Sequence, residues 1–375
     1  VNSFLFKPEI QIKEVWQRKT GAGSRNFYTR LIPAVTEDRI FVADITGQVM
    51  AYERNKGRLL WQKSFPDAIS GGVFVGYGVV LFGTQEGNIF ALDASNGQTL
   101  WEKSLSSEVL SVPQANGQLV IVQTLDGKLF ALDQKTGAQK WLFQVTVPSL
   151  SLRGTSSPKL LDEIVLAGFA NGKLIAVLLQ TGLPVWERAV AQPQGRSELD
   201  RIVDIDGDFI VDGQTVYAAT FQGNIAAIDL RSGRPIWQRE MSSALGLAEG
   251  LGSIYVIDSN SRIVALDQPS GADVWEQKAL QNKKLSAPVA LGNYIVTGDD
   301  EGFLHFISQI DGRIVEKIRI KGSADNLNPQ AKPKARFTPT RIEPGNGLRT
   351  EPVVKDGLLY VINNSGTLRA LSVVN

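Results

Sequence analysis

One seventeen-residue pattern recurs along the chain at intervals of about 40 residues. It reads QEGNIFALDASNGQTLW at 85–101, LDGKLFALDQKTGAQKW at 125–141 and FQGNIAAIDLRSGRPIW at 221–237. An apolar run precedes the first glycine, an alternating run follows it, and a second glycine closes another turn before the tryptophan. Glycine supplies the positive φ that such tight hairpin turns require. Short strands and turns in units of this length predict four-stranded blades around an axis.

The repeat occurs eight times, although only seven units are complete. The first turn position holds Gly47, Gly87, Gly127, Gly172, Gly223, Ser261, Gly302 and Gly366, and the last position holds Trp61, Trp101, Trp141, Trp186, Trp237, Trp275 and Glu316. The chain ends before the eighth unit reaches a tryptophan, and Trp16 precedes every complete unit. We therefore expect an all-β, eight-bladed propeller spanning residues 1–375 as one domain. The N-terminal strand carrying Trp16 should complete the last blade and remove an exposed sheet edge. We expect all seven tryptophans to pack between blades.

Composition excludes several classes of function. Lys and Arg number 39 against 38 Asp and Glu, so the balanced charge gives no field for steering onto nucleic acid. The chain has no cysteine and therefore no disulfide or thiolate chemistry. Its longest apolar stretch, 71–83, is interrupted by glycines and is shorter than the roughly 20 residues that a membrane span needs. Because the sequence does not start with Met, we interpret it as a mature form whose targeting segment has been removed.

Four connections between blades are longer than the repeat requires. They run over 16–33, 141–158, 186–208 and 316–352, and they lead into blades one, four, five and eight. All are of the same type, so we expect them on one face of the disc. Because blades four and five are neighbours, and blades eight and one meet at the ring closure, we expect two loop clusters on opposite sides of that face.

The first cluster contains Leu150, Leu152 and Arg153 together with Asp204 and Asp206. Two leucines beside an arginine on an extended loop suit an interface with a protein partner. The alternative is structural: the leucines pack under their own loop, while Arg153 and Asp204 hold the two loops together. The run DIDGD at 204–208 also suggests a calcium-binding loop. An EF-hand loop has glycine at its sixth position and glutamate at its twelfth, whereas here glycine is fourth and the twelfth residue is Thr215. We therefore expect no metal and no cofactor.

The second cluster combines 16–33 with a Pro-rich insertion at 323–349. The insertion carries five basic residues: Lys332, Lys334, Arg336, Arg341 and Arg349. One reading is a mobile solvated loop. The other is a second docking surface for another protein subunit, or for acidic lipopolysaccharide or lipid head groups. The single histidine, His305, lies within a strand pattern, and we expect it to be structural.

The blade pattern A-[IL]-D-x-x-[ST]-G-x-x-x-W resembles the tryptophan-docking repeats of quinoprotein-type eight-bladed propellers. One branch of these propellers contains pyrroloquinoline-quinone dehydrogenases, which are longer and use adjacent cysteines and a calcium site that this chain does not offer. The other branch is the BamB family of outer-membrane β-barrel assembly factors. The resemblance to this family is closer and includes RNFYTRLIPA at 25–34, VPSLSLRGTSSP at 147–158, SELDRIVDIDGD at 197–208 and GNIAAIDLRSGRPIWQRE at 223–240.

This resemblance implies a non-enzymatic scaffold at the periplasmic face of the Gram-negative outer membrane. It implies that Leu150, Leu152, Arg153, Asp204 and Asp206 contact the periplasmic POTRA domains of BamA, the barrel subunit. It also implies assistance to unfolded β-barrel precursors, which an exposed blade edge could bind by strand addition. We expect a monomer within a hetero-oligomeric complex. The family's lipidated N-terminal cysteine is not in this sequence, which begins at Val1. The alternatives are a propeller that binds a small molecule in its central channel and a degenerate quinone-dependent dehydrogenase.

Overall fold

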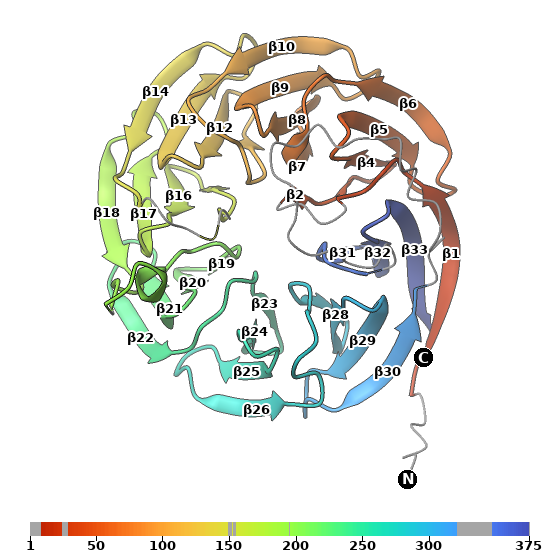
Figure 1. The fold of residues 1–375 in the computed structure, drawn as a ribbon, viewed down its shortest axis with the longest axis vertical. Helices are drawn as coiled ribbons and strands as arrows, with labels where there is room; N and C mark the ends of the chain where they lie inside the picture. The colour runs from red at the N-terminus through yellow and green to blue at the C-terminus, as the bar shows by residue number, and fades with distance from the viewer. Residues whose placement is uncertain are drawn as a thin grey trace.

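Eight sheets of mainly antiparallel strands stand around a common axis (Figure 1). The computed structural model describes residues 9–24, 29–148, 152, 155–194, 196–320 and 347–374. The predicted all-β, eight-bladed architecture is confirmed. Among the described residues, no helix combines the length and the apolar character needed to cross a membrane.

Each blade is a meander whose strands run outward from the axis in chain order. The strands of blades one to four are β3 (Ala34–Val35), β4 (Arg39–Ala43), β5 (Gln48–Glu53) and β6 (Leu59–Ser64); β7 (Ile69–Gly76), β8 (Val79–Thr84), β9 (Asn88–Asp93) and β10 (Thr99–Ser104); β11 (Gln114–Ala115), β12 (Leu119–Thr124), β13 (Lys128–Asp133) and β14 (Gln139–Gln144); and β15 (Lys159–Leu160), β16 (Ile164–Gly168), β17 (Lys173–Leu178) and β18 (Pro184–Ala189).

The remaining blades continue the same order around the ring. Their strands are β19 (Ile210–Asp212), β20 (Thr215–Ala219), β21 (Asn224–Asp229) and β22 (Pro235–Glu240); β23 (Ala248–Gly250), β24 (Ser253–Ile257), β25 (Ile263–Asp267) and β26 (Asp273–Gln277); β27 (Val289–Leu291), β28 (Tyr294–Gly298), β29 (Phe303–Ser308) and β30 (Ile314–Arg319); and β31 (Val353–Lys355), β32 (Leu358–Ile362) and β33 (Thr367–Val374) with β1 (Gln11–Lys19). A short 3₁₀ helix, η1 (Leu199–Arg201), and strand β2 (Arg30–Leu31) lie in connections between blades.

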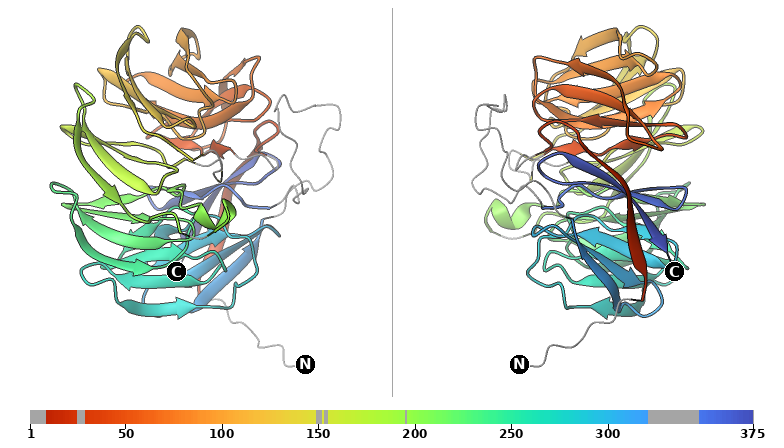
Figure 2. Two further views of the ribbon diagram at one scale, coloured as in Figure 1. Left: turned by 60° about the vertical axis from the view of Figure 1, so that its left-hand side comes forward. Right: turned by 90° about the vertical axis from the view of Figure 1, so that its right-hand side faces the viewer.

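The N-terminal strand closes the ring, as predicted. Strand β1 pairs antiparallel with β33, from Gln11 opposite Val374 to Lys19 opposite Thr367, and so forms the outer strand of blade eight. Trp16 of this strand is buried and packs with residues of blades one and eight. Figure 2 shows β1 crossing the rim beside the C-terminal strands. The last blade is therefore built from both ends of the chain.

All seven tryptophans pack between blades, which confirms their predicted role. Each indole lies against the glycine of the next blade's outer hairpin, where an added methyl group would fall within 3 Å of the ring. Each indole nitrogen also donates a hydrogen bond to the carbonyl of the third residue before that glycine, as Trp101 does to Gln134 at 2.8 Å. The full set of donors and acceptors is Trp16 to Arg54, Trp61 to Ala94, Trp101 to Gln134, Trp141 to Leu179, Trp186 to Leu230, Trp237 to Gln268 and Trp275 to Gln309.

The interface between blades seven and eight is different because Glu316 occupies the tryptophan position. No hairpin follows β33, so there is no glycine for an indole to cover. The N-terminal segment fills the site instead: Ile10 is buried with residues of both blades, and the Glu9 amide donates to the Val315 carbonyl at 3.1 Å. The chain start thus replaces the missing tryptophan contact.

The segment predicted as the 16–33 connection contains one short strand. Strand β2 pairs in parallel with β7, with Arg30 opposite Gly71 and Leu31 opposite Gly72, and adds a fifth strand to blade two on its axial side. This pairing brings Arg30 toward the axis. Of the predicted insertion at 323–349, residues 323–346 lie outside the described residues.

Candidate functional site at the axial face

Two long connections predicted to form a loop cluster are joined by hydrogen bonds. The Leu152 amide donates to the Asp204 carboxylate at 2.8 Å, and the Ser157 amide donates to the Asp208 carboxylate at 2.6 Å. The carboxylates of the blade five connection therefore hold the blade four connection through its backbone. Leu150 and Arg153, the other two predicted contact residues on this loop, lie outside the described residues.

A half-buried arginine, Arg30, links this cluster to two other connections. The Arg30 guanidinium donates to the Asp206 carbonyl at 2.8 Å and to the Thr155 carbonyl at 3.3 Å. It also pairs with Asp208 at 3.0 Å and lies 3.8 Å from Glu351 of blade eight. Burial opposes its charge, but the three surrounding carboxylates outweigh burial and raise the pKa of Arg30.

The contacts of Arg30 show that the predicted arrangement of the loops is wrong. We expected two clusters on opposite sides of the face, but Arg30 comes from the 16–33 connection and contacts residues of the connections into blades four, five and eight. The prediction counted blade positions around the rim. It is wrong because the connections run inward, where opposite blades are separated only by the width of the axial channel.

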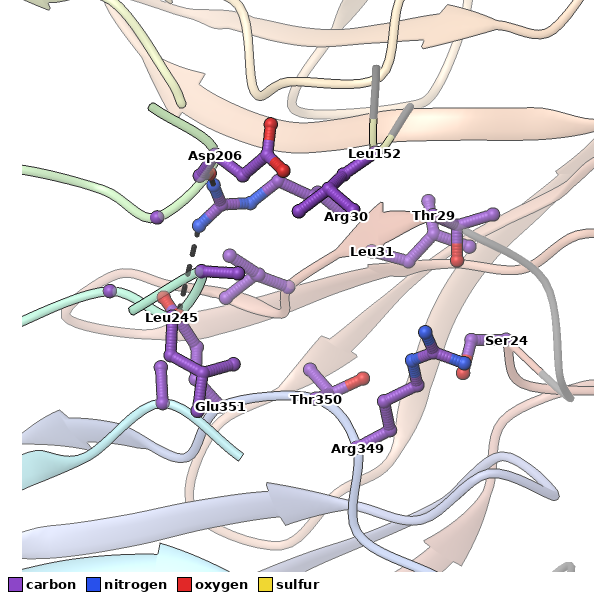
Figure 3. Close-up of a pocket in the computed structure, with 15 residues that line it drawn as sticks. Ser24, Thr29, Arg30, Leu31, Leu152, Asp206, Leu245, Arg349, Thr350 and Glu351 are labelled. Atoms are coloured by element: carbon purple, nitrogen blue, oxygen red, sulfur yellow. Dashed lines mark hydrogen bonds and ion pairs between the residues drawn. The ribbon is translucent and has the colours of Figure 1, made fainter. Parts of the chain in front are cut away.

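A pocket of about 340 Å³ opens where these connections meet (Figure 3). Leu31, Leu152 and Leu245 give it apolar walls, while Asp206 and Glu351 lie beside Arg30, and Arg349 lies at the opposite end of the pocket. Arg30, Asp208 and Glu351 were not among the predicted site residues. Arg30 and Asp208 lie in the family-like segments 25–34 and 197–208, but no spacing or motif distinguishes them from their neighbours.

Asp204 and Asp206 are both buried, with 0% and 8% of their surface exposed. Burial raises the pKa of Asp204 to about 6, against the opposing effect of the Leu152 amide. Burial, together with the neighbouring charge of Asp204, raises the pKa of Asp206 to about 8, against the opposing charge of Arg30. One oxygen of each carboxyl has no hydrogen-bond partner among the described residues. Asp204 therefore acts within the loop cluster, while Asp206 is mostly buried at the wall of the pocket.

The two raised pKa values predict that this region loses stability as pH rises. A carboxyl whose folded pKa exceeds its ordinary value of about 4 binds more protons in the folded state than in the unfolded state. Its contribution to the free energy of unfolding is therefore fully present below pH 4. That contribution is lost as pH rises through the folded pKa values of about 6 for Asp204 and about 8 for Asp206. An amide mimics the protonated acid. We therefore expect Asp206→Asn to unfold with a flatter pH profile than wild type, and to gain on the order of a few kcal/mol relative to it between pH 5 and pH 8.

Urea unfolding at three pH values across that range measures this effect. Asp200→Asn is the control, because Asp200 is exposed in the same connection and its pKa is lowered by hydrogen bonds from Ser197. Parallel pH profiles for wild type and Asp206→Asn would contradict the prediction.

An exposed leucine in the same cluster was not among the predicted site residues. Leu199 is the first residue of η1, which stands out from one face of the disc (Figure 2), and 64% of its surface is exposed. Leu152, in the other connection of the cluster, is half-buried and lines the axial pocket. Single exposed apolar side chains are common on protein surfaces, so Leu199 is of interest only because it lies in one of the two long connections. The sequence signal was present in SELDR at 197–201, but only the structure places Leu199 outside the core.

Carboxylates and the single histidine are the side chains of this protein that could hold a metal ion. Among the residues described, no group of three His, Cys, Asp or Glu side chains is placed to hold a metal ion. His305 is buried in β29 and shares a hydrogen bond of 2.8 Å with the buried Asp299. This contact agrees with the structural role expected of His305.

The comparisons with known proteins identify the family. The family model described as outer membrane protein assembly factor BamB matches residues 13–70, 57–277 and 259–375. The BamB protein of Pseudomonas aeruginosa is 49% identical over 98% of this chain and 91% of its own. The chain belongs to the BamB family. The BamB protein of Escherichia coli is 34% identical over 95% of this chain and 88% of its own. The crystal structure of BamB from Moraxella catarrhalis superposes with a TM-score of 0.84 at 29% identity, over 96% of this chain and all of that one.

Family membership decides between the functions left open by the sequence. BamB proteins are non-enzymatic outer membrane protein assembly factors, which confirms the prediction that the chain is not an enzyme. A europium-containing methanol dehydrogenase also superposes, with a TM-score of 0.73 over 96% of this chain and 93% of its own. Its sequence identity is only 13%, so this similarity shows the shared fold alone.

Proposed function

We propose that this BamB-family protein is a periplasmic scaffold subunit that binds the POTRA domains of BamA. The observation that carries the proposal is the joined pair of connections into blades four and five. The propeller does not need either connection to close, yet Asp204 and Asp208 hold them together through the Leu152 and Ser157 amides. A rigid scaffold that positions irregular loops is the usual basis of a binding site.

The residues of the cluster divide into contact and positioning roles. Leu150, Leu152 and Arg153 contact the partner in this proposal, and Leu199 extends the surface because it is exposed. Asp204 and Asp206 are buried, so they set the shape of the loops and do not pair with charges on the partner. Arg30 serves the same purpose from the other side of the axis. Docking would then depend on loops prepared in advance, which reduces the cost of ordering them on binding.

The cellular location and the oligomeric state that we propose follow from this docking function. The scaffold would act at the periplasmic face of the outer membrane, held there by a lipid anchor, as one copy in a hetero-oligomeric complex. By binding BamA it would help to bring unfolded β-barrel precursors to the site of insertion.

Calorimetric titration of the full chain into a fragment of BamA's periplasmic domains tests the proposal. We expect saturable binding that Arg153→Glu weakens by about 100-fold or more, because charge reversal at an interface hot spot costs at least about 2–4 kcal/mol. Leu199→Asp should weaken binding by about tenfold. Arg196→Glu is the matched control: Arg196 is exposed in the same connection, and reversing its charge should change affinity by less than about threefold.

Circular dichroism and thermal unfolding confirm first that each variant is folded. Binding that is unchanged by Arg153→Glu and Leu199→Asp would move the interface away from the blade four and five connections. An absence of binding at high micromolar concentration would overturn the scaffold proposal.

A further inference from the structure

The groove at the ring closure has a composition unlike the other grooves between blades. It lies between the outer strand β1 of blade eight and strands β5 and β6 of blade one (Figure 1), and it encloses about 660 Å³. Its lining includes four basic residues, Arg18, Lys19, Lys56 and Arg58, and no carboxylate. It is on the rim of the disc, whereas the loop cluster proposed for BamA lies at the axial face.

The internal repeat shows that this charge is specific to one groove. The positions of Arg18, Lys56 and Arg58 recur at every outer hairpin of the ring. The other six sets are Lys63, Asn96 and Gln98; Lys103, Thr136 and Ala138; Phe143, Thr181 and Leu183; Arg188, Ser232 and Arg234; Arg239, Ser270 and Ala272; and Gln277, Asp311 and Arg313. None of these sets has three basic residues. The blade architecture therefore does not require the cations at the closure.

The Arg18 charge is positioned but not neutralised. Its guanidinium donates to the backbone carbonyls of Gly57 at 2.8 Å, Lys56 at 2.9 Å and Gln17 at 2.7 Å. No carboxylate of the described chain pairs with Arg18 or with Lys56. Arg58 pairs with Glu53 at 3.2 Å, but 73% of its side chain is exposed. A guanidinium held rigidly by carbonyls is prepared to bind an anion at little entropic cost.

A buried phenol adds a hydrogen-bond donor to the groove. Tyr52 is only 5% exposed and lines the groove, and its hydroxyl donates to the Met50 sulfur at 3.4 Å, which is a weak acceptor. Burial, reinforced by Asp44, raises the pKa of Tyr52 to about 12 against the opposing charge of Arg18, so the phenol keeps its proton. The other seven blades have an aliphatic residue at this position: Leu92, Leu132, Val177, Ile228, Leu266, Ile307 and Leu371.

The buried acid behind the groove, Asp44, is already satisfied by the protein. It is fully buried. Its two carboxylate oxygens accept hydrogen bonds from the Ala22, Thr46 and Gln48 amides and from the Thr46 hydroxyl. These donors hold the Asp44 carboxylate in place, and its negative charge offsets part of the positive charge that Arg18, Lys56 and Arg58 bring to the groove.

We propose that the ring-closure groove binds the phosphate of an organic phosphate ligand, held by Arg18, Lys56 and Arg58 with the Tyr52 hydroxyl as a further donor. Guanidinium, ammonium and phenol donors form the charge-assisted hydrogen bonds that phosphate oxygens accept. Leu59 forms an apolar wall beside them and is 48% exposed, which suits the carbon portion of such a ligand. The phosphate could belong to a lipid head group or to a soluble ester, and the chemistry at the groove is the same.

Two phosphate probes, a lipid phosphodiester and a soluble phosphomonoester, test the proposal on the full chain. The first is co-sedimentation with phosphatidylcholine vesicles with and without phosphatidylglycerol, and the second is calorimetric titration with glycerol 3-phosphate. If the protein binds anionic vesicles and glycerol 3-phosphate competes with them, the site accepts phosphate from either a lipid or a soluble ester. If the protein binds the vesicles and glycerol 3-phosphate does not compete, the site is supported with a lipid as the source of the phosphate. Binding to neither probe overturns the proposal.

Three variants locate the binding. Lys56→Gln combined with Arg58→Gln should weaken it by roughly tenfold or more, whereas Arg231→Gln with Arg234→Gln removes two exposed charges from the corresponding hairpin of blade five and should change it by less than about threefold. Tyr52→Phe keeps the charge and should weaken binding roughly fivefold. Equal losses in the two double variants, or an unchanged Tyr52→Phe, would show only nonspecific attraction and overturn the proposal. BamA binding should be unaffected by all of them, so the two proposals can fail separately.

Discussion

Replacing Trp101 with alanine is expected to lower the free energy of unfolding by about 3–5 kcal/mol, because it leaves a large cavity between two blades. The ring of Trp101 is 8% exposed and belongs to the core between blades two and three. Its nitrogen donates to the Gln134 carbonyl at 2.8 Å, which would lose this partner. The cavity cannot collapse easily, since moving blade three inward would strain the interfaces that close the ring.

Urea unfolding followed by circular dichroism measures the loss. Leu100→Ala is the matched control: it is the preceding residue of β10, 50% exposed on the rim, and it should change stability by less than about 1 kcal/mol. Gly137→Ala tests the same contact from the other blade, because an added methyl would lie 2.7 Å from the Trp101 ring at a backbone φ of +71°. Equal effects of Trp101→Ala and Leu100→Ala would contradict the packing role.

Replacing Arg30 with methionine is expected to cost about 2–3 kcal/mol, because several charge-assisted hydrogen bonds of a half-buried guanidinium are lost together. The Arg30 guanidinium reaches Asp208 at 3.0 Å and the Asp206 carbonyl at 2.8 Å. Without it, Asp208 would lose its ion-pair partner, and the pKa values of Asp206 and Glu351 would rise further because Arg30 no longer opposes their burial. Methionine preserves much of the side-chain volume, so the loss reports charge and hydrogen bonding more than packing.

Thermal and urea unfolding measure this effect, and Arg58→Met is its control. Arg58 pairs with Glu53 at 3.2 Å, but its side chain is 73% exposed, and surface pairs contribute less than about 1 kcal/mol. Arg30→Met should also weaken binding to BamA's periplasmic domains, since the loops at the axial face would lose their shared anchor. A stable Arg30→Met variant would show that the connections hold their shape independently.

The repeat made the blades predictable from the sequence. Gly137 and Trp101 recur at fixed spacing because each blade meets its neighbour in the same way, so one local pattern encodes both the strands and the contact between them. The absence of an eighth tryptophan after Gly366, together with the unmatched Trp16, was enough to predict closure by the N-terminal strand.

The loops at the axial face were predictable only in part. Their lengths identified the connections that the blades do not need, and they pointed to Leu152, Asp204 and Asp206. The length of a connection does not show whether it runs toward the axis or along the rim. The meeting of these connections at Arg30 was therefore not predicted, and neither was the exposure of Leu199. The burial of the two aspartates also depends on loops separated by about 50 residues, which no local pattern reports.

The sequence by itself determined the number of blades, the way in which the ring closes and the family, because each depends on residues at regular spacing or on a continuous match. Only the tertiary structure decided which irregular segments meet. Arg30, Asp208 and Glu351 are brought together by closure of the ring, and so are Arg18 and Tyr52 at the rim. Contacts between blades that are far apart in the chain arise from the circular arrangement, and the repeat has no position that encodes them.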